Sequence, residues 1–333
     1  MNQADTLPAR AVVADIGGTN ARFAVANLET LELTEIGHFL CSEHPSLASA
    51  ARAYLEALKH PPRHGAIAVA APVVGEAIKL TNSPWSFTRS ELCCALGLDG
   101  VLVLNDFHAL ALSLPFLGSA ELHRLGGGEP APRAPKVVLG PGTGIGVAGL
   151  VWGGSDWVGV PSEGGHISLA ANSAEEFALA MRLRSGRPHL SVERVLSGPS
   201  LADLYRAVAA SHGETPAPLA PNDVLTRGLA GSDQIAVEAL HLFVVWLGAF
   251  AGDAALFFGA RGGVYLGGGI APKILDALST EAFRYAFEEK GRMQSYLAPI
   301  PVSVILAPFA ALKGAAAGLR SCLATGAVGL TTA

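Results

Sequence analysis

The stretch Ala11-Val-Val-Ala-Asp-Ile-Gly-Gly-Thr-Asn-Ala-Arg-Phe-Ala-Val-Ala26 decides the fold of this 333-residue chain. It begins with an apolar, β-rich run, and residues 22–26 resume that run after a turn of glycine, threonine and asparagine. Two strands around a short glycine-containing turn predict a β-hairpin. Glycine in such a turn also lets backbone amides approach a ligand closely. We therefore expect the chain to open with a strand, a glycine turn and a second strand.

The same pattern returns in the middle of the chain. Residues 137–139 and 145–151 predict two strands, and the residues between them form a second glycine turn that contains Thr143. This weak similarity indicates two related halves rather than a solenoid. A third glycine cluster, Gly267-Gly268-Gly269, follows another predicted strand.

Predicted strands alternate with helices along most of the chain. Further strands are expected at residues 31–40, 66–71, 101–104, 157–160, 263–266 and 302–306. Helices are expected at residues 47–58 after Ser46, 88–96 beginning at Thr88, 107–114, 173–184, 200–210, 233–258, 276–288 and 310–324. This alternation predicts an α/β protein in which helices cover mixed sheets. Residues 126–135 are rich in Gly and Pro, and they are the composition-based candidate for a hinge or domain boundary.

The composition excludes several classes of protein. Half of the residues are apolar and 15% are charged, which excludes a disordered chain. The 23 basic and 28 acidic residues give a formal charge of −5, and the basic residues are dispersed singly. We therefore expect no binding to nucleic acid and none to an anionic membrane surface. Residues 240–260 are apolar enough to span a bilayer, but Asp253, Gly248 and Gly252 lie within them, which favours a buried core helix.

The cysteines and the N-terminal residues indicate the cellular compartment of the protein. Cys41, Cys93, Cys94 and Cys322 form neither a CxxC pair nor a zinc-binding spacing. So few cysteines in a chain of this length indicate free thiols in a reducing compartment. The first ten residues lack the apolar run of a signal peptide. These features predict a cytoplasmic protein.

The glycine clusters are candidates for phosphate binding, and the alternative for each cluster alone is a tight turn. Three clusters, two of which carry a threonine hydroxyl, favour phosphate binding. A P-loop is excluded because no Gly-x-x-x-x-Gly-Lys-Ser/Thr motif occurs. Residues 144–149 match the dinucleotide-binding fingerprint, but residues 147–151 predict a strand where that fingerprint needs a helix.

Asn105 and Asp106 directly follow the buried strand predicted at residues 101–104. A carboxylate at a strand end is well placed to take a proton from a substrate. The alternative is that these residues cap the helix predicted at residues 107–114. The residue types leave the two roles about equally supported, and the roles are compatible.

Glu163 and His166 are separated by two glycines, and Glu193 follows 30 residues later. Such side chains suit hydrogen bonding to sugar hydroxyls. They could equally bind a metal ion, but a metal site needs a third ligand at a matching spacing, and the local sequence offers none. We therefore expect no metal site formed by protein side chains.

Read together, these segments resemble bacterial glucokinases, within the hexokinase/actin/Hsp70-type ATPase superfamily. The resemblance extends in order from Val12 to about Gly318. The segments that carry it are residues 14–22, 104–107, 139–146, 161–166, 192–198, 262–270, 286–292 and 300–302. His108 stands where the family commonly has Glu, and residues 308–313 lack an expected polar residue. The related ROK sugar kinases carry a cysteine-rich zinc motif that the cysteine positions here do not match.

The resemblance implies a two-domain actin-like ATPase fold of the ribonuclease H-like type, with a central cleft. Residues 8–116 plus 308–333 would form a small α/β domain, and residues 117–307 a large one. The implied reaction converts ATP and D-glucose into ADP and D-glucose 6-phosphate at the entry to glycolysis. Asp106 would act as the general base, and Asn105, Glu163, His166 and Glu193 would bind the sugar together with Asp106.

The resemblance also assigns the nucleotide site. ATP would be the co-substrate, with Mg²⁺ bridging its phosphate oxygens and Asp15 nearby through water. The residues implied to contact the nucleotide are Ala14, Asp15, Ile16, Gly17, Gly18, Thr19, Asn20, Gly142, Thr143, Gly144, Gly268 and Gly269. Glucose and ATP are the partners implied, and a homodimer is compatible with the family.

Two other functions stay open from the sequence. One is a kinase of another hexose, such as fructose or mannose, with the same machinery. The other is a sugar sensor without enzymatic activity, related to sugar-responsive repressors. A sensor of that type needs a DNA-binding helix-turn-helix, whereas about ten residues precede the first predicted strand. A sensor also has no use for Asp106 as a base.

Overall fold

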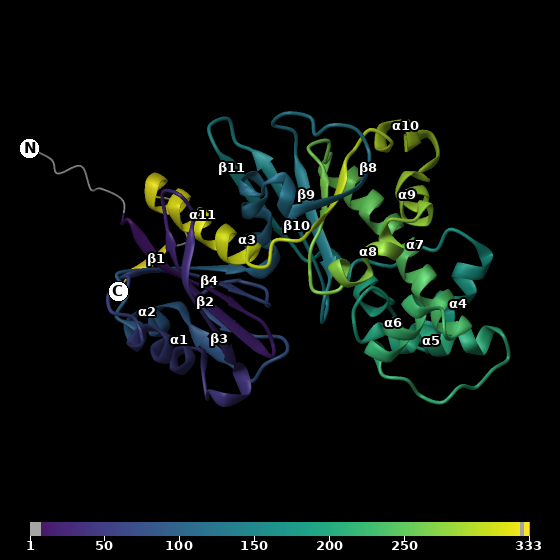
Figure 1. Ribbon diagram of the computed structural model, residues 1–333, viewed down its shortest axis with the longest axis horizontal. Coiled ribbons are helices and arrows are strands. Elements are labelled where there is room, and N and C mark those ends of the chain that lie inside the picture. Colours follow the sequence, from purple (N-terminus) through teal and green to yellow (C-terminus); the bar gives the residue numbers. More distant parts are fainter. Residues whose placement is uncertain (1–7, 327–329, 333) are drawn as a thin grey trace, which may run out of the picture. The chain divides into compact units, whose positions relative to one another are not determined.

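The computed structural model describes residues 8–326 and 330–332. It divides into two compact units (Figure 1). The first unit consists of Met1–Leu117 and Ala307–Ala333, and the second of Gly118–Leu306. Each unit is built on a six-stranded sheet.

The sheet of the first unit has the strand order β14-β7-β4-β1-β2-β3. The strands are β1 (Arg10–Ile16), β2 (Asn20–Asn27), β3 (Leu33–Leu40), β4 (His64–Val69), β7 (Gly100–Asn105) and β14 (Leu330–Thr332). The β1–β2 and β2–β3 pairs are antiparallel, whereas β1, β4 and β7 are parallel to one another. The β1–β2 hairpin therefore forms as predicted, and the parallel strands bring their carboxyl ends to one edge.

Helices cover both faces of this sheet. Side chains alternate along β1, so that Val12, Ala14 and Ile16 pack under α1 (Leu47–Glu56) and α2 (Arg89–Leu96). Ala11 and Val13 point to the opposite face, which α3 (Asp106–Ser113) and α11 (Ala310–Thr325) cover (Figure 1). Strands buried on both faces explain why the sequence there is almost continuously apolar.

The sheet of the second unit has the order β11-β10-β9-β12-β13-β8. The strands are β8 (Leu122–Gly126), β9 (Lys136–Pro141), β10 (Ile145–Trp152), β11 (Trp157–Ser162), β12 (Val264–Leu266) and β13 (Val302–Ile305). Three antiparallel strands, β11, β10 and β9, are followed by the parallel strands β12 and β13. The first unit has the same arrangement in β3, β2, β1, β4 and β7, so the two related halves predicted from the sequence are present.

The helices of the second unit pack into one large core. They are α4 (Ala174–Arg184), α5 (Ser200–Ser211), α6 (Pro221–Ala230), α7 (Gln234–Phe258), α8 (Leu275–Leu278), α9 (Glu281–Glu288) and α10 (Gln294–Leu297). Helix α7 is the one helix among the described residues that is long and apolar enough to cross a membrane. Its side chains Phe243, Trp246 and Leu247 are nevertheless buried in the core of the unit. This confirms the predicted buried core helix.

Several predicted elements need correction. The helix predicted at residues 276–288 is two helices, α8 and α9, because the Ser279 and Thr280 hydroxyls donate to the carbonyls of Leu275 and Ala277 and end the first of them. The sequence reading missed α6 and the short strands β8, β14, β5 (Ala77–Lys79) and β6 (Ser86–Thr88). Residues 126–135 are not a boundary between the units, since they lie inside the second unit.

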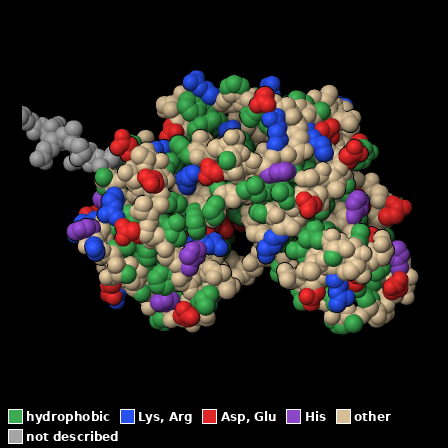
Figure 2. Space-filling view, in the orientation of Figure 1, with side chains coloured by type: hydrophobic (Ala, Val, Ile, Leu, Met, Phe, Trp, Pro, Cys, Tyr) green, Lys and Arg blue, Asp and Glu red, His purple; other side chains and the backbone are tan. Residues whose placement is uncertain are grey.

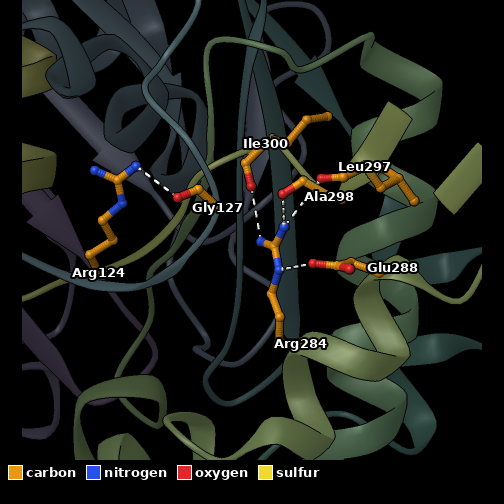
Figure 3. Close-up of polar contacts among 7 residues, drawn as sticks. All are labelled: Arg124, Gly127, Arg284, Glu288, Leu297, Ala298 and Ile300. Atoms are coloured by element: carbon orange, nitrogen blue, oxygen red, sulfur yellow. Dashed lines mark hydrogen bonds and ion pairs between the residues drawn. The ribbon is translucent and has the colours of Figure 1, made fainter. Parts of the chain in front are cut away.

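Arg284 on α9 joins three segments of the second unit (Figure 3). Its guanidinium donates to the carbonyls of Ile300 at 2.9 Å and Ala298 at 2.6 Å, and it pairs with Glu288. A planar guanidinium has enough donors to hold several acceptors at once. Arg284 thereby fixes the end of α10 and the approach to β13. Nearby, Arg124 donates to the carbonyl of Gly127 (Figure 3).

Acidic and basic side chains are mixed over the face of the molecule shown in Figure 2, and no continuous basic surface is visible there. This agrees with the dispersed charges of the sequence.

Candidate active site

The first unit contributes the turn between β1 and β2. The amide of Gly17 donates to the carbonyl of Asn20 at 2.9 Å, which closes the turn. A Cβ atom on Gly18 would lie 2.6 Å from the carbonyl oxygen of Asn82, so only glycine fits there. Thr19 and Asn20 are exposed and free to meet a ligand. Ala14 and Ile16 have core side chains, so only their backbone atoms could contact a nucleotide.

Cys41, which the sequence reading left without a role, supports this turn. Its amide donates to the carbonyl of Thr19 at 2.9 Å, and its thiol lies 3.5 Å from the carbonyl oxygen of Gly17. Burial raises the pKa of the thiol, which therefore stays protonated and able to donate. No local pattern could have revealed this contact, because the residues are 24 positions apart.

Asp15 lies near the end of β1 and pairs with Arg22 on the adjacent strand. The two residues are cross-strand partners, and Arg22 Nη1 lies 3.0 Å from Asp15 Oδ2. Burial raises the pKa of Asp15, and the guanidinium partly opposes that shift. The pair therefore places one partly compensated carboxyl group beside the glycine turn.

Asn105 and Asp106 lie at the same edge of the sheet as Asp15. Ile16 pairs with Val69, and Val69 pairs with Asn105, so the ends of β1, β4 and β7 are in line. Asn105 is the N-cap of α3, since its Oδ1 accepts from the amides of Phe107 at 3.0 Å and His108 at 3.1 Å.

Asp106 is the first residue of α3 rather than its cap. Burial raises the pKa of Asp106 to about 7, and the nearby Asp15 carboxylate adds to the shift, while a hydrogen bond from the Phe107 amide opposes it. Burial also lowers the pKa of His108, so the neighbouring imidazole is neutral at pH 7. Asp106 is thus a carboxyl group that titrates near neutrality, which suits a general base.

The second unit contributes the turn between β9 and β10, formed by Gly142, Thr143 and Gly144. The amide of Gly142 donates to the carbonyl of Gly144 at 2.7 Å, and the Thr143 side chain is exposed. The turn therefore presents an exposed hydroxyl between partly exposed glycines, and the β1–β2 turn of the first unit likewise presents Thr19 beside two partly exposed glycines.

The third glycine cluster lies against the same turn. A Cβ atom on Gly140 would lie 2.0 Å from the carbonyl oxygen of Gly267, and one on Gly268 would lie 2.5 Å from that of Pro141. Gly268 also has a φ of +78°, which favours glycine. Gly269 has open space around it. Backbone contact this close explains why both segments are glycine-rich.

The predicted sugar-binding residues of the second unit border this turn. Glu193 Oε2 accepts from the amide of Ile145 at 3.2 Å. Gly165 packs on the carbonyl of Ile145, since a Cβ atom there would lie 2.2 Å from that oxygen. Glu163 and His166 flank Gly165, and their side chains are 4.0 Å apart and more than half exposed. The fold thus brings Glu163, His166 and Glu193 to one end of the second sheet.

Within residues 8–326 and 330–332, no group of three or more His, Cys, Asp or Glu side chains could hold a metal ion by itself. Beside the first glycine turn, Asp15 offers a carboxylate, and Arg22 donates to its Oδ2. Mg²⁺ typically binds one or two carboxylates, substrate phosphates and several waters. Asp15 therefore fits Mg²⁺ that arrives with a nucleotide.

The comparisons with known proteins agree on one family. The glucokinase family model matches residues 12–322. The glucokinase of Cronobacter sakazakii is 42% identical over 313 residues, which are 94% of this chain and 98% of that protein.

Solved structures give the same result. A glucokinase from an Antarctic psychrotroph has a TM-score of 0.85 and 37% identity, over 94% of this chain and 99% of that chain. A ROK-family glucokinase from Streptomyces griseus, in complex with glucose and AMPPNP, shares the fold with a TM-score of 0.63 at 20% identity, over 92% of this chain and 98% of that chain.

Proposed function

Because this chain belongs to the glucokinase family, we infer that it transfers a phosphoryl group from ATP to D-glucose, giving ADP and D-glucose 6-phosphate. The predicted α/β fold of the two-domain actin-like ATPases is confirmed by the solved structures. The observation in this molecule that carries the assignment is Asp106, a half-buried carboxyl group whose surroundings raise its pKa to about 7, at the sheet edge that also carries a glycine turn.

In the proposed mechanism, Asp106 accepts the proton of the sugar 6-hydroxyl as that oxygen attacks the γ-phosphorus of ATP. The O–P bond to the sugar forms while the bond to the ADP oxygen breaks, in line. A base with a pKa near the working pH combines a large deprotonated fraction with useful basicity. Asn105, by capping α3, would hold Asp106 at the start of the helix.

The remaining sugar hydroxyls would be bound by Asn105, Glu163, His166 and Glu193. All four side chains can form hydrogen bonds with hydroxyls, and those to the carboxylates of Glu163 and Glu193 are strengthened by charge. A site that bonds a hydroxyl rejects analogues lacking it, because its own polar groups are then left unpaired. These proposed contacts would favour glucose over other hexoses.

The two glycine turns would bind the nucleotide phosphates through backbone amides and the hydroxyls of Thr19 and Thr143. Gly17, Gly18, Gly142 and Gly144 would permit the close approach. Asp15 would hold Mg²⁺ through water, and the bound ion would neutralise phosphate charge. Gly268 and Gly269 would lie near the adenosine.

The wider expectations follow the family. We propose a glycolytic enzyme of the cytoplasm that binds neither nucleic acid nor membranes. The homodimer stays a prediction.

A coupled assay with several hexoses tests the substrate. We expect glucose to give a higher kcat/KM than fructose, mannose or galactose, with ATP and Mg²⁺ required. A clear preference for fructose or mannose would assign the chain to another hexose. No phosphorylation of any hexose, with glucose still bound, would favour the sugar sensor.

A further inference from the structure

We propose that Glu193 couples sugar binding to nucleotide binding. One oxygen of its carboxylate holds the turn of Gly142, Thr143 and Gly144, and the other oxygen is left for the sugar. This inference rests on the proposed function of Glu193 as a sugar ligand and of the turn as a phosphate site. What it adds is that Glu193, as a sugar ligand, and the phosphate-binding turn are in direct contact within the second unit.

The first contact is the hydrogen bond from the Ile145 amide to Glu193 Oε2, at 3.2 Å. Ile145 is the first residue of β10, directly after the turn, and its partner on β9 is Pro141. The Pro141 carbonyl accepts from the amide of Ile270. The carboxylate of Glu193 thus satisfies the amide at which the turn ends.

The second contact is with the turn itself. A Cβ atom on Gly144 would lie 2.2 Å from Glu193 Oε2 and 3.1 Å from its Cδ. Since real Cβ atoms do not approach an oxygen so closely, any side chain at Gly144 would displace the carboxylate. Gly144 is therefore needed to let Glu193 rest on the turn, apart from any need of the phosphate.

The segment that carries Glu193 also holds the other end of the turn. The amide of Gly198 donates to the carbonyl of Gly142 at 2.7 Å. This segment is rigidly anchored, because Val195 and Leu196 are buried in the core. The buried Ser200 hydroxyl accepts from the amide of Ser197 at 3.0 Å, which ties the segment to the start of α5. The turn is therefore clamped at both ends by one segment.

The second oxygen of Glu193, Oε1, makes no hydrogen bond within the described residues 8–326 and 330–332, and the side chain is partly exposed. A carboxylate can accept with both oxygens. A sugar hydroxyl donating to Oε1 would restrict rotation of the carboxylate and so keep Oε2 on the Ile145 amide. Bound sugar would thereby stabilise the turn conformation that binds phosphate and so lower the dissociation constant of the nucleotide by some factor, which we call the coupling factor. Bound nucleotide must lower the dissociation constant of the sugar by the same factor.

The test measures this factor by calorimetry. The dissociation constant of AMPPNP with Mg²⁺ is determined without glucose and at saturating glucose. For the unmodified protein we expect glucose to tighten AMPPNP binding about fivefold or more, as is typical of coupled sites. In Glu193→Gln, an amide offers one acceptor where the carboxylate offers two, so the factor should fall to about one.

Two comparisons separate coupling from simple loss of a ligand. Glu163→Gln removes the charge of a proposed sugar ligand that makes no bond to the turn, so glucose should bind more weakly while the coupling factor is kept.

The second comparison is between two glycines of the turn. Gly144→Ala should weaken glucose binding about tenfold in the absence of nucleotide, the size of a lost hydrogen bond to a charged group. Gly142→Ala should leave the dissociation constant of glucose without nucleotide unchanged, since a Cβ atom at Gly142 meets nothing within 4 Å.

The outcomes are distinguishable. An unchanged factor in Glu193→Gln, or equal glucose binding by Gly144→Ala and Gly142→Ala, would overturn the coupling while leaving the kinase intact. So would a factor of one in the unmodified protein when glucose binds and is phosphorylated. A protein that binds no glucose would overturn the proposed function itself.

Discussion

The Asp15 carboxylate raises the pKa of Asp106, although the two residues are 91 positions apart in the sequence. The relationship follows from the sheet, in which β1 and β7 lie on either side of β4 with their carboxyl ends in line. Two like charges at one edge oppose each other's ionisation. The residue proposed to position Mg²⁺ thus also tunes the proposed base.

The pH dependence of glucose phosphorylation tests this relationship. Because Asp106 must be deprotonated to accept a proton, kcat/KM for glucose at saturating ATP and Mg²⁺ should rise with pH to a plateau, with a midpoint near 7. In Asp15→Asn the midpoint should move to lower pH, since the like charge is gone. Nucleotide ionisation is the same in both proteins, so equal midpoints would contradict the relationship.

The stability of the protein should fall as the pH rises, whereas its activity rises. The pKa of Asp106 is raised from 3.8 to about 7 on folding. Its contribution to stability is therefore complete below pH 3.8 and is lost as the pH rises through about 7. We expect Asp106→Asn to have a higher Tm than the unmodified protein at pH 8, with a difference that shrinks toward pH 4. A difference independent of pH would show that Asp106 ionises normally.

Asn105→Ala tests the support of Asp106 by the helix cap. Loss of the hydrogen bonds to the Phe107 and His108 amides should lower the free energy of unfolding by about 1 kcal/mol. It should also lower kcat/KM for glucose, because Asp106 follows directly. Ser46→Ala removes the cap of α1, where Ser46 Oγ accepts from the Ser49 amide at 3.1 Å, and so provides a matched control. Equal kcat/KM values for the two variants would remove Asn105 from the site.

Gly314→Ala tests how α11 positions the helix that begins with Asp106. A Cβ atom on Gly314 would lie 1.7 Å from the Ala109 carbonyl oxygen, so α3 must shift. Overpacking should lower the free energy of unfolding by about 1–3 kcal/mol, although alanine favours a helix by about 1 kcal/mol over glycine. Urea unfolding should show a lower free energy of unfolding, and kcat for glucose should also be lower.

Gly318→Ala in the same helix is the comparison for this change. The atoms nearest to a Cβ there are the flexible ends of the Leu112 and Leu104 side chains, at 3.0 and 3.1 Å. We expect a smaller loss of stability and an unchanged kcat. A Gly314→Ala variant as stable as the unmodified protein would contradict the close contact of α11 with α3.

Local patterns were sufficient to predict most of the fold. The two glycine hairpins and the helices predicted after Ser46 and at Thr88 are set by neighbouring residues, and the structure has each of them. The structure adds that Thr88 and Glu91 form a capping box at the start of α2. The short strands β8 and β14 were missed because their pairing with β13 and β7 joins distant parts of the chain. Helix α6 was missed because its first turn begins Pro221-Asn222-Asp223, which reads as a loop.

The site was predictable only as a set of residue types. The order of the motifs identified Asp106, Glu193 and the glycine turns as candidates, but it could not predict which of them are in contact. The support of the turn by Cys41, the Asp15–Arg22 pair and the contact of Glu193 with Ile145 all join residues that are not sequence neighbours. Such contacts follow from strand register and loop packing, which no local pattern encodes.

The kcat of Asp106→Asn tests the central claim most directly. Asn keeps the size of the side chain and can still accept from the Phe107 amide, but it cannot accept the hydroxyl proton. We expect kcat for glucose to fall by about 10²–10⁴, with glucose binding retained in calorimetry. A variant that binds glucose and keeps more than about a tenth of the original kcat would contradict the assignment of Asp106 as the general base.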